Sequence, residues 1–574
     1  MKKIYSLLTI FIIAFIGISC DNNDDDDTNN NPSGDFIENF GNSTAKDFMG
    51  QVVDENNNPI ENVTIRIGNS TAMTDQNGVF IINNASVYEK FAYIKAEKAG
   101  YINGSRSVLP TNGLNQVKIR MIVNTPIATI NSGQNSEVDL PNGTKVTFDG
   151  AFKNENGMAY TGAVSVSMYH LEASNSNISE IMPGMLLAEA EDGSAKVLET
   201  FGMLNVELTG SSGEKLQIAD GHNAQISMKI DMEQSGNASS SIPLWHFDEE
   251  NGYWKEDGVA TKQGDYYVGN VSHFSWWNCD APFPVVNLCI SLVNDNNEPL
   301  SGVQVDLSFA GQTYPRSGVS NGDGEICGLV PANETITLEI LDTCGNVVYT
   351  STIGPFSVNT VLPAIVVPSG SVTQSLVQGT LVTCNNQNIT NGYVILNSGN
   401  ETIVQTVTNG VFSFNTLVCS ANDSFTLQGF DYDTLQTTGI INYMFNVPIT
   451  TIGNLQACTT VSEFISYQID NEPVDYFISN LSAEYSPNGL YIYIPQNDDI
   501  YLGTNDNVLG IKNQFYVGGL EVGYITQSNV GFTFILNSFG AVGDYIDITF
   551  YGNYIGPAGN PHYISGVVHV IRDN

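Results

Sequence analysis

The chain has 574 residues, with 60 acidic and 20 basic side chains and a formal net charge of −40 at pH 7. At roughly 100 to 200 residues per domain, this length predicts about three to six domains. Charged residues make up only 14% of the chain, and Gly, Asn, Ser, Thr, Val, Ile and Tyr dominate, which favours short strands and tight turns. The sequence therefore predicts an all-β protein built from several domains, and its negative charge argues against nucleic acid as a partner.

The N-terminus has the pattern of an export signal. Two lysines precede an apolar run of fifteen residues from Ile4 to Ile18, which as a helix would span about 22 Å, less than the ~30 Å hydrocarbon core of a bilayer. Residues 1–19 are therefore interpreted as a signal peptide. The small residue followed by Cys20 resembles a bacterial lipobox, in which the cysteine is lipidated and becomes the mature N-terminus. An ordinary secretory signal is the alternative.

Residues 20–45 are polar and acidic, with four consecutive aspartates from Asp24 to Asp27. A segment of this composition cannot bury a core, so we expect a disordered tether. Its position resembles the acidic export signal that follows the lipidated cysteine in surface lipoproteins of Bacteroidetes bacteria. This resemblance implies a protein anchored in the outer membrane by lipid and facing the cell exterior, and a plain spacer on a periplasm-facing lipoprotein is the alternative.

Residues 46–123 alternate apolar and polar residues around two turns. The residues that carry this pattern are Gly50, Val52, Pro59, Val63, Ile65, Ile67, Asn77, Gly78, Gly100 and Tyr101. The segment resembles the carboxypeptidase regulatory-like domain, a small transthyretin-like, Ig-like β-sandwich. The same plan recurs in residues 284–366 and more faintly in 372–458. Three tandem sandwiches are therefore expected, and in the families that carry them such domains act as spacers or binding modules.

Two further β domains are expected. Residues 124–283 contain alternating segments separated by Gly-rich or Asn-rich turns, and the part from Pro243 to Gly258 resembles the extracellular domain of cartilage intermediate layer proteins. Residues 459–574 end in two alternating segments, 544–554 and 562–572, which predict a pair of long strands joined by a turn.

All four tryptophans lie in the middle domain, at Trp245, Trp254, Trp276 and Trp277, with Asp248 and other acidic residues nearby. Aromatic platforms beside carboxylates are suited to binding sugars, or to glycoside hydrolysis if two acids lie about 5 to 9 Å apart. The alternative is that the tryptophans form the core of the domain.

Signatures of enzymatic catalysis and metal binding are weak. Residues 318–322 match G-x-S-x-G, but no helix pattern follows them, so a turn is expected there. The sequence contains no Walker loop, H-E-x-x-H or C-x-x-C, and its six histidines are dispersed, so no transition-metal site is predicted. The loops at 497–499 and 505–507 offer oxygen ligands for Ca²⁺ without EF-hand spacing, and are interpreted as solvated loops. We therefore expect neither an enzyme nor a bound cofactor.

One short motif suggests self-cleavage. His273, Phe274 and Ser275 resemble the self-cleavage site of extracellular and death-domain-associated β domains, where the serine hydroxyl attacks the preceding carbonyl and the histidine acts as base or polariser. The alternative is a terminal strand in which Phe274 packs in the core and Ser275 faces a turn.

Apart from Cys20, the chain has seven cysteines, at positions 279, 289, 327, 344, 384, 419 and 458. An exported protein favours disulfides, but seven cysteines cannot all pair. Pairs within the second and third sandwiches are expected, each contributing roughly 2 to 4 kcal/mol. The preferred single bond is Cys384–Cys419.

These features together predict a surface lipoprotein whose β-sandwich domains hold a binding or adhesion surface away from the outer membrane. The lipid on Cys20 would contact the membrane, and a glycan or a neighbouring surface protein is the expected ligand. Two alternatives are an extracellular carbohydrate-active enzyme that uses the tryptophan-rich segment, and a passive structural component of a surface assembly.

Overall fold

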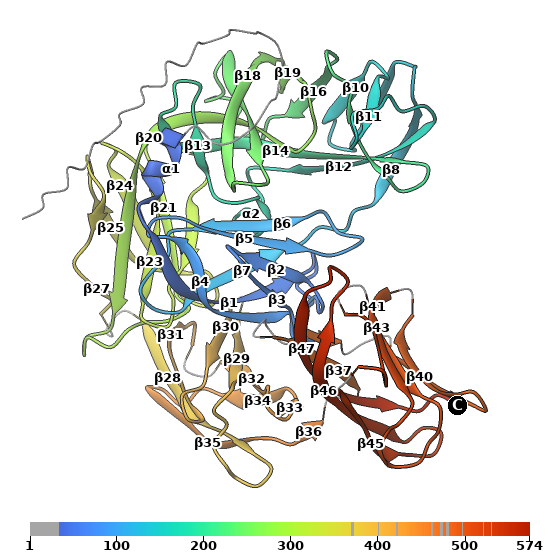
Figure 1. Ribbon diagram of the computed structural model, residues 1–574. Helices are drawn as coiled ribbons and strands as arrows, with labels where there is room; N and C mark the ends of the chain where they lie inside the picture. The colour runs from blue at the N-terminus through green and yellow to red at the C-terminus, as the bar shows by residue number, and fades with distance from the viewer. Residues whose placement is uncertain are drawn as a thin grey trace, which may run out of the picture.

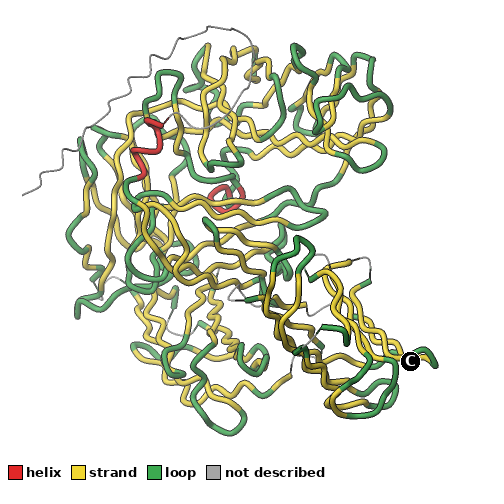
Figure 2. Tube along the Cα trace, in the orientation of Figure 1, coloured by secondary structure: helices red, strands yellow, loops and turns green. Residues whose placement is uncertain are grey.

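The computed structural model describes residues 34–574 except 369–371, 400, 421–422, 461–462, 471–474, 478–480, 496, 520–521 and 530. The predicted signal peptide, the predicted lipidation site Cys20 and the four aspartates therefore lie outside the described residues. The regular secondary structure of the described chain is almost entirely strand, which confirms the all-β prediction (Figure 2). The exceptions are two single-turn α-helices and one 3-10 turn. None of the described helices is long and apolar enough to cross a bilayer.

The first domain is a sandwich of two sheets, with strand orders β4-β1-β7 and β3-β2-β5-β6. Alternate residues of the strands point between the sheets, and Phe48, Val52 and Ile65 are fully buried there. The strands are β1 (Ser43–Val53), β2 (Thr64–Ile67), β3 (Ser70–Met73), β4 (Val79–Tyr88), β5 (Ala92–Glu97), β6 (Gly104–Val108) and β7 (Asn115–Arg120).

The middle domain is built on long, shared strands. Its elements are β8 (Pro126–Asn131), β9 (Ser136–Asp139), β10 (Lys145–Phe148), β11 (Phe152–Asn154), β12 (Ala163–Leu171), α2 (Ile178–Ile181), β13 (Leu187–Glu189), β14 (Ala195–Gly210), β15 (Lys215–Ile218), β16 (Ala224–Lys229), β17 (Ser241–Asp248), β18 (Tyr253–Gln263) and β19 (Tyr266–Val271). The 18-residue strand β20 (Trp276–Val293) pairs with β14 and β17 over its first half. Its second half belongs to the second sandwich, so the boundary predicted between 283 and 284 falls inside one continuous strand.

The second and third sandwiches follow the middle domain along the chain. The second continues with β21 (Gln304–Phe309), β22 (Arg316–Val319), β23 (Glu325–Pro331), β24 (Ile336–Leu341), β25 (Val347–Ile353), β26 (Thr360–Val361) and β27 (Ile365–Val366). The third consists of β28 (Thr373–Thr383), β29 (Gly392–Ser398), β30 (Glu401–Thr406), β31 (Val411–Val418), β32 (Ser424–Asp431), β33 (Gln436–Thr437), β34 (Ile441–Met444), β35 (Ile449–Ala457) and β36 (Thr459–Thr460).

The three sandwiches share one plan, as the sequence repeats predict. In each, the first strand pairs antiparallel with one strand and parallel with a later one: β1 with β4 and β7, β20 with β23 and β26, and β28 with β31 and β35. The turn after the first strand is alike in the first and second sandwiches. The side chain of Asp54 in the first, and of Asn294 in the second, accepts hydrogen bonds from the backbone N–H groups two and four residues later. Gly78 and Gly324 adopt positive φ in the second turn, where a Cβ would meet the Val52 or Leu292 carbonyl oxygen at 2.3 or 2.5 Å.

The segment before β1 is ordered, which shortens the predicted tether. Residues 34–45 were expected to belong to it, but α1 (Gly34–Ile37) and η1 (Glu38–Phe40) pack between the first and middle domains. The Phe36 ring lies 4.6 Å from that of Tyr253 and the Phe40 ring 4.2 Å from that of Phe91, measured between centroids. Burial of these two aromatic rings contributes to ordering the segment, against the conformational entropy lost by its backbone. The mostly polar composition of residues 20–45 does not reveal this contribution.

The first sandwich lies at the centre of the molecule, with the middle domain, the second sandwich and the third sandwich around it (Figure 1). On the middle-domain side, Glu180 of α2 accepts hydrogen bonds from Arg120 Nε at 3.0 Å and Nη2 at 2.7 Å. On the third-sandwich side, the Tyr393 hydroxyl donates to Asp75 at 2.6 Å. Polar groups that are buried at both junctions fix the relative placement of the domains.

The C-terminal domain is a separate sandwich beside the third one (Figure 1). Its strands are β37 (Phe464–Ile469), β38 (Asp475–Phe477), β39 (Ser482–Ser486), β40 (Gly489–Ile494), β41 (Asn497–Thr504), β42 (Gly510–Ile511), β43 (Phe515–Gly519), β44 (Gly523–Thr526), β45 (Thr533–Phe539), β46 (Tyr545–Ile555) and β47 (Pro561–Ile571). One sheet has the order β38-β37-β47-β46-β45-β42 and the other β39-β40-β41-β43-β44. The predicted terminal strand pair is confirmed as the antiparallel pair β46 and β47.

Among the described residues, the disulfides are Cys289–Cys327, Cys344–Cys419 and Cys384–Cys458, and Cys279 is free and buried. The predicted bond Cys384–Cys419 is therefore wrong. Strands β28 and β35 run parallel with Thr383 opposite Ala457, so the residues that follow, Cys384 and Cys458, meet at the ends of the two strands. Cys419 instead bonds a cysteine of the second sandwich and ties the two domains together.

Candidate ligand-binding sites

The tryptophans of the middle domain are buried. Trp245 and Trp254 have 0% exposure, Trp277 has 1% and Trp276 has 3%. They pack in two adjoining hydrophobic cores of the domain, and the indole N–H of Trp245 donates to the Asp280 carbonyl at 3.1 Å. The interpretation of these residues as a sugar-binding platform is wrong, because no face of the rings is free to stack on a ligand.

Asp248 has a structural role at the turn between β17 and β18. Its Oδ1 accepts the backbone N–H groups of Glu250 and Asn251, both at 3.0 Å, and Lys255 Nζ lies 2.9 Å from Oδ2. Burial alone would raise the pKa of Asp248, but the hydrogen bonds from Asn251 and Lys255 outweigh it and lower the pKa. The predicted binding set of four tryptophans and Asp248 is thus a set of core residues and a turn.

The His273–Ser275 motif lies just before β20 and is held by the side chain of Gln217. Gln217 Nε2 donates to the Phe274 carbonyl, and the Phe274 N–H donates to Gln217 Oε1, each at 2.7 Å. Phe274 is only 5% exposed, the Ser275 hydroxyl donates to the Trp276 carbonyl at 3.2 Å, and none of the three motif residues has a positive φ. These contacts favour the structural alternative, and self-cleavage stays a prediction.

The acidic loops show partners within the protein. The Asp506 carboxylate pairs with Lys512 Nζ and accepts the Val508 N–H at 2.9 Å, while the side chains at 497–499 lie outside the described residues. In the part of the chain that the structure describes, the group of potential metal ligands is Asp342 with Cys344 and Cys419. Both of these cysteines are in a disulfide, so they offer no thiolate to a metal.

One outer face of the C-terminal domain carries a row of tyrosines, which we call the tyrosine face. Its members are Tyr491 and Tyr493 on β40, Tyr501 on β41, Tyr516 on β43 and Tyr524 on β44. Ring centroids of neighbours lie 4.7 Å apart for the pair on β40 and 6.5 Å apart between β43 and β44. The aliphatic residues that alternate with them, such as Ile492, Leu502 and Val517, are fully buried between the sheets, so the strand period of two places every tyrosine on the outside.

Two glycines let the rings lie against the sheet. Gly503 is opposite Tyr516, and Gly518 is opposite Tyr501. A Cβ on Gly503 would come within 2.4 Å of the Tyr516 hydroxyl, and one on Gly518 within 2.4 Å of Tyr501 Cζ. The rings therefore lie across the glycine positions instead of standing up from the strands, and Tyr524 at the end of the row is 63% exposed.

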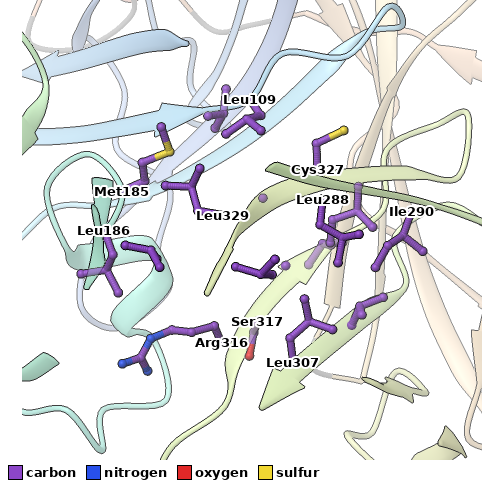
Figure 3. A pocket seen from close by; sticks show the side chains of 18 of the residues that line it. Leu109, Met185, Leu186, Leu288, Ile290, Leu307, Arg316, Ser317, Cys327 and Leu329 are labelled. Atoms are coloured by element: carbon purple, nitrogen blue, oxygen red, sulfur yellow. The ribbon is translucent and has the colours of Figure 1, made fainter. Parts of the chain in front are cut away.

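A cavity of about 290 Å³ lies where the first, middle and second domains meet (Figure 3). The labelled lining residues in Figure 3 are Leu109, Met185, Leu186, Leu288, Ile290, Leu307, Arg316, Ser317, Cys327 and Leu329. Leu109 follows β6 of the first domain, Met185 precedes β13 of the middle domain, and the others from Leu288 onward belong to the second sandwich. The wall is thus assembled from segments more than 200 residues apart in the chain.

Sequence reasoning missed both the tyrosine face and the cavity. The alternation of tyrosine with isoleucine over 491–494 is a visible signal for the first, although the opposing glycines depend on strand register. No comparable signal exists for the cavity, because its wall forms only when three domains dock.

No protein-family model and no curated protein matches the chain. Among solved structures, the shaft pilin SpaA of Lactobacillus rhamnosus GG matches 31% of this chain and 98% of its own, with 10% identity and a TM-score of 0.16. The Bacillus anthracis TIE protein matches 78% of this chain and 74% of its own, with 11% identity and a TM-score of 0.14. BcpA, the major pilin subunit of Bacillus cereus, matches 72% and 100%, with 9% identity and a TM-score of 0.12. Scores this low carry no argument, so the assignment of the fold class depends on the strands themselves.

Proposed function

We propose that the protein is a lipid-anchored adhesion protein of the cell surface that binds neutral polysaccharide through the tyrosine face. The observation that supports this function is the row of tyrosine rings lying across Gly503 and Gly518 on an outer sheet. Such rings offer apolar faces to sugar rings and hydroxyls to sugar hydroxyls. The net charge of −40 disfavours polyanionic glycans, so the proposal is restricted to uncharged ones.

The rest of the chain acts in this proposal as a support. The middle domain and the second sandwich share strand β20, and the second and third sandwiches share the Cys344–Cys419 disulfide. The first sandwich contacts its neighbours through buried polar pairs. The C-terminal domain lies at one end of this block (Figure 1), which is a suitable position for contact with a ligand outside the cell.

Anchoring at the surface is tested with two variants. Cys20→Ala should release the protein from the membrane fraction, because the lipid is the proposed anchor. Changing Asp24–Asp27 to alanine while keeping Cys20 should leave the protein membrane-bound but shielded from protease added to intact cells. If both variants stay at the cell surface, the proposed anchor and export signal are wrong.

Binding is tested with the purified protein lacking residues 1–20, titrated with soluble β-glucan, xylan and mannan, and with alginate as an anionic polysaccharide. We expect one of the neutral glycans to bind, alginate not to bind, and a Tyr516→Ala/Tyr524→Ala variant to lose at least tenfold in affinity. The matched control is Tyr551→Ala, which removes a 40% exposed tyrosine from the opposite sheet of the same domain.

Three results would contradict the proposed function: no binding to any neutral glycan, equal binding to alginate, or equal losses in the tyrosine-face variant and in its control. Absence of all glycan binding together with co-purification of a neighbouring surface protein would instead favour the passive structural role. The four tryptophans on which the carbohydrate-active enzyme alternative depended are buried, so the proposal assigns sugar binding to the tyrosine face instead. Turnover of a chromogenic glycoside by the purified protein would favour the enzyme.

A further inference from the structure

The cavity between the first, middle and second domains is independent of the tyrosine face, and its wall is mostly apolar. Leu307, Ile326 and Leu329 belong to the second sandwich, and each stays partly exposed instead of closing the core. Met182 and Met185 face the same space from the middle domain. Flexible methionines and half-covered aliphatic side chains form a surface that an apolar ligand would cover.

The wall also carries guanidinium groups whose hydrogen bonding is incomplete. Arg316 Nη1 donates to the carbonyls of Tyr314 at 3.4 Å and Pro315 at 3.3 Å, while Arg316 Nε is shielded from solvent and has no hydrogen-bond partner. Arg106, on β6 of the first domain, lines the cavity too, and its Nη1 is likewise buried without a partner. Buried charged groups normally have hydrogen-bond acceptors for their N–H groups. The two unpaired N–H groups therefore indicate that the cavity has room for an acceptor that the described protein does not supply.

The nearby carboxyl groups do not fill this role. Glu199 and Glu325 line the cavity and Asp280 lies close to Arg316, but among the described residues none of the three forms an ion pair with Arg316 within 4 Å. Burial raises the pKa of both Glu199 and Asp280, which weakens them as counter-ions. The Arg316 guanidinium is therefore the cationic side of a mainly apolar chamber, and in Figure 3 its side chain lies at the edge that faces the middle domain.

The cavity has a route to solvent. Ser317 and Val319 line it from β22, which is the edge strand of its sheet. Both residues are exposed, Val319 to 49%. A ligand can therefore enter beside this strand without the separation of the three domains.

We propose that this cavity binds one fatty acid of medium chain length, with its hydrocarbon chain against the aliphatic and methionine side chains and its carboxylate at Arg316 Nε. The volume of about 290 Å³ is just below the ~300–1,000 Å³ typical of small-molecule sites, so the cavity has room for a single hydrocarbon chain. Because three domains contribute to the wall, the bound acid would also hold them together.

The first experiment uses the protein lacking residues 1–20, after removal of any co-purified lipid, and isothermal titration with three ligands of equal chain length. Laurate, dodecanol and dodecylamine differ only in the head group. We expect one laurate per chain, bound at least tenfold more tightly than dodecylamine. No laurate binding overturns the proposal, and binding of dodecylamine as tight as that of laurate overturns the role of the guanidinium.

Variants locate the site. Arg316→Met should lower the affinity for laurate at least tenfold and leave that for dodecanol within about twofold. Leu307→Trp and Met185→Trp fill the cavity from opposite sides and should each abolish binding of laurate. The control Val347→Trp introduces the same indole side chain on the second sandwich, at a position that is 50% exposed, and should leave the affinity for laurate unchanged.

Folding of each variant is checked by near-UV circular dichroism. Two cavity-filling variants are used so that the test still works if one of them misfolds. If both are folded and still bind laurate, the ligand is elsewhere and the proposal is wrong. If both misfold, the comparison of laurate with dodecanol in Arg316→Met decides it: equal losses for the two ligands, or no loss, overturn the proposed contact.

Discussion

The middle domain and the C-terminal domain both concentrate aromatic residues on their strands, and they use them in opposite ways. Trp245 and Trp254 have no exposed surface, whereas Tyr491 and Tyr524 are 41% and 63% exposed. The neighbours along each strand account for the difference. Trp254 follows the equally buried Tyr253, because both faces of β18 are covered, while each tyrosine of the tyrosine face alternates with an inward aliphatic residue. The alternation of aromatic with aliphatic residues along a strand, and not the number of aromatic residues, therefore distinguishes the exposed tyrosine face from the buried tryptophans.

The largest expected effect separates these two regions by stability. Trp254→Ala should lower the free energy of unfolding by about 3 to 5 kcal/mol, because it leaves a cavity in the core. Tyr524→Ala should change it by no more than about 0.5 kcal/mol, since the side chain is mostly in water. Urea denaturation followed by far-UV circular dichroism measures both values. Similar losses in the two variants would mean that Tyr524 is a packing residue.

A third kind of tyrosine lies at the junction of the first and third sandwiches. The hydroxyls of Tyr393 and Tyr432 approach Asp75 to 2.6 and 3.2 Å. Burial raises the pKa of Asp75 to about 6, even though the hydrogen bond from Tyr393 acts in the opposite direction. The folded protein therefore holds this proton up to a higher pH than the unfolded chain, in which the pKa is about 3.9.

Ionisation of Asp75 should therefore lower the free energy of unfolding as the pH rises from about 4 to about 6, by up to about 3 kcal/mol. Above this window the free energy of unfolding should not change further on account of Asp75. Asp75→Asn removes this titration. Relative to the natural protein, the variant should gain up to about 3 kcal/mol between pH 4 and pH 7 in urea denaturation. If the free energies of unfolding of the two proteins differ by the same amount at every pH, the raised pKa assigned to the buried Asp75 carboxyl is wrong.

Local pattern was sufficient to predict much of the fold. The turn at Pro59 and its counterpart in residues 284–366 predicted sandwiches of one plan. The alternation near the C-terminus predicted the strand pair β46 and β47. The disulfide of Cys384 could not be predicted in the same way, because it depends on the parallel register of β28 and β35, which lie far apart in sequence.

The candidate sites were harder to predict than the fold. The tryptophans attract attention in the sequence, but their burial depends on a second core that forms against the first domain. The tyrosine face has a local signal in the alternation at 491–494, yet the flat setting of the rings depends on cross-strand glycines. The cavity has no local signal, because Arg316 and Met185 meet only after the domains dock.

A smaller effect should sharpen the description of the tyrosine face. Gly518→Ala places a methyl group where Tyr501 Cζ lies 2.4 Å away, so the ring must lift from the sheet. Affinity for the neutral glycan should fall about tenfold, equivalent to about 1.4 kcal/mol. The control Gly236→Ala adds a methyl group in an exposed loop with nothing within 4 Å. Unchanged affinity in Gly518→Ala would show that the ring orientation is not what the ligand recognises.

The smallest expected effect concerns Ser275, which lies directly before the buried pair Trp276 and Trp277. Self-cleavage would need the Ser275 hydroxyl to attack the Phe274 carbonyl from a strained backbone, but this carbonyl accepts a hydrogen bond from Gln217 at 2.7 Å and the residue packs in the core. We therefore expect the purified protein to remain one full-length band on a denaturing gel after long incubation, as should Ser275→Ala. Two bands corresponding to residues 20–274 and 275–574, abolished by the substitution, would show instead that this peptide bond is cleaved and that the burial of Phe274 serves to position it.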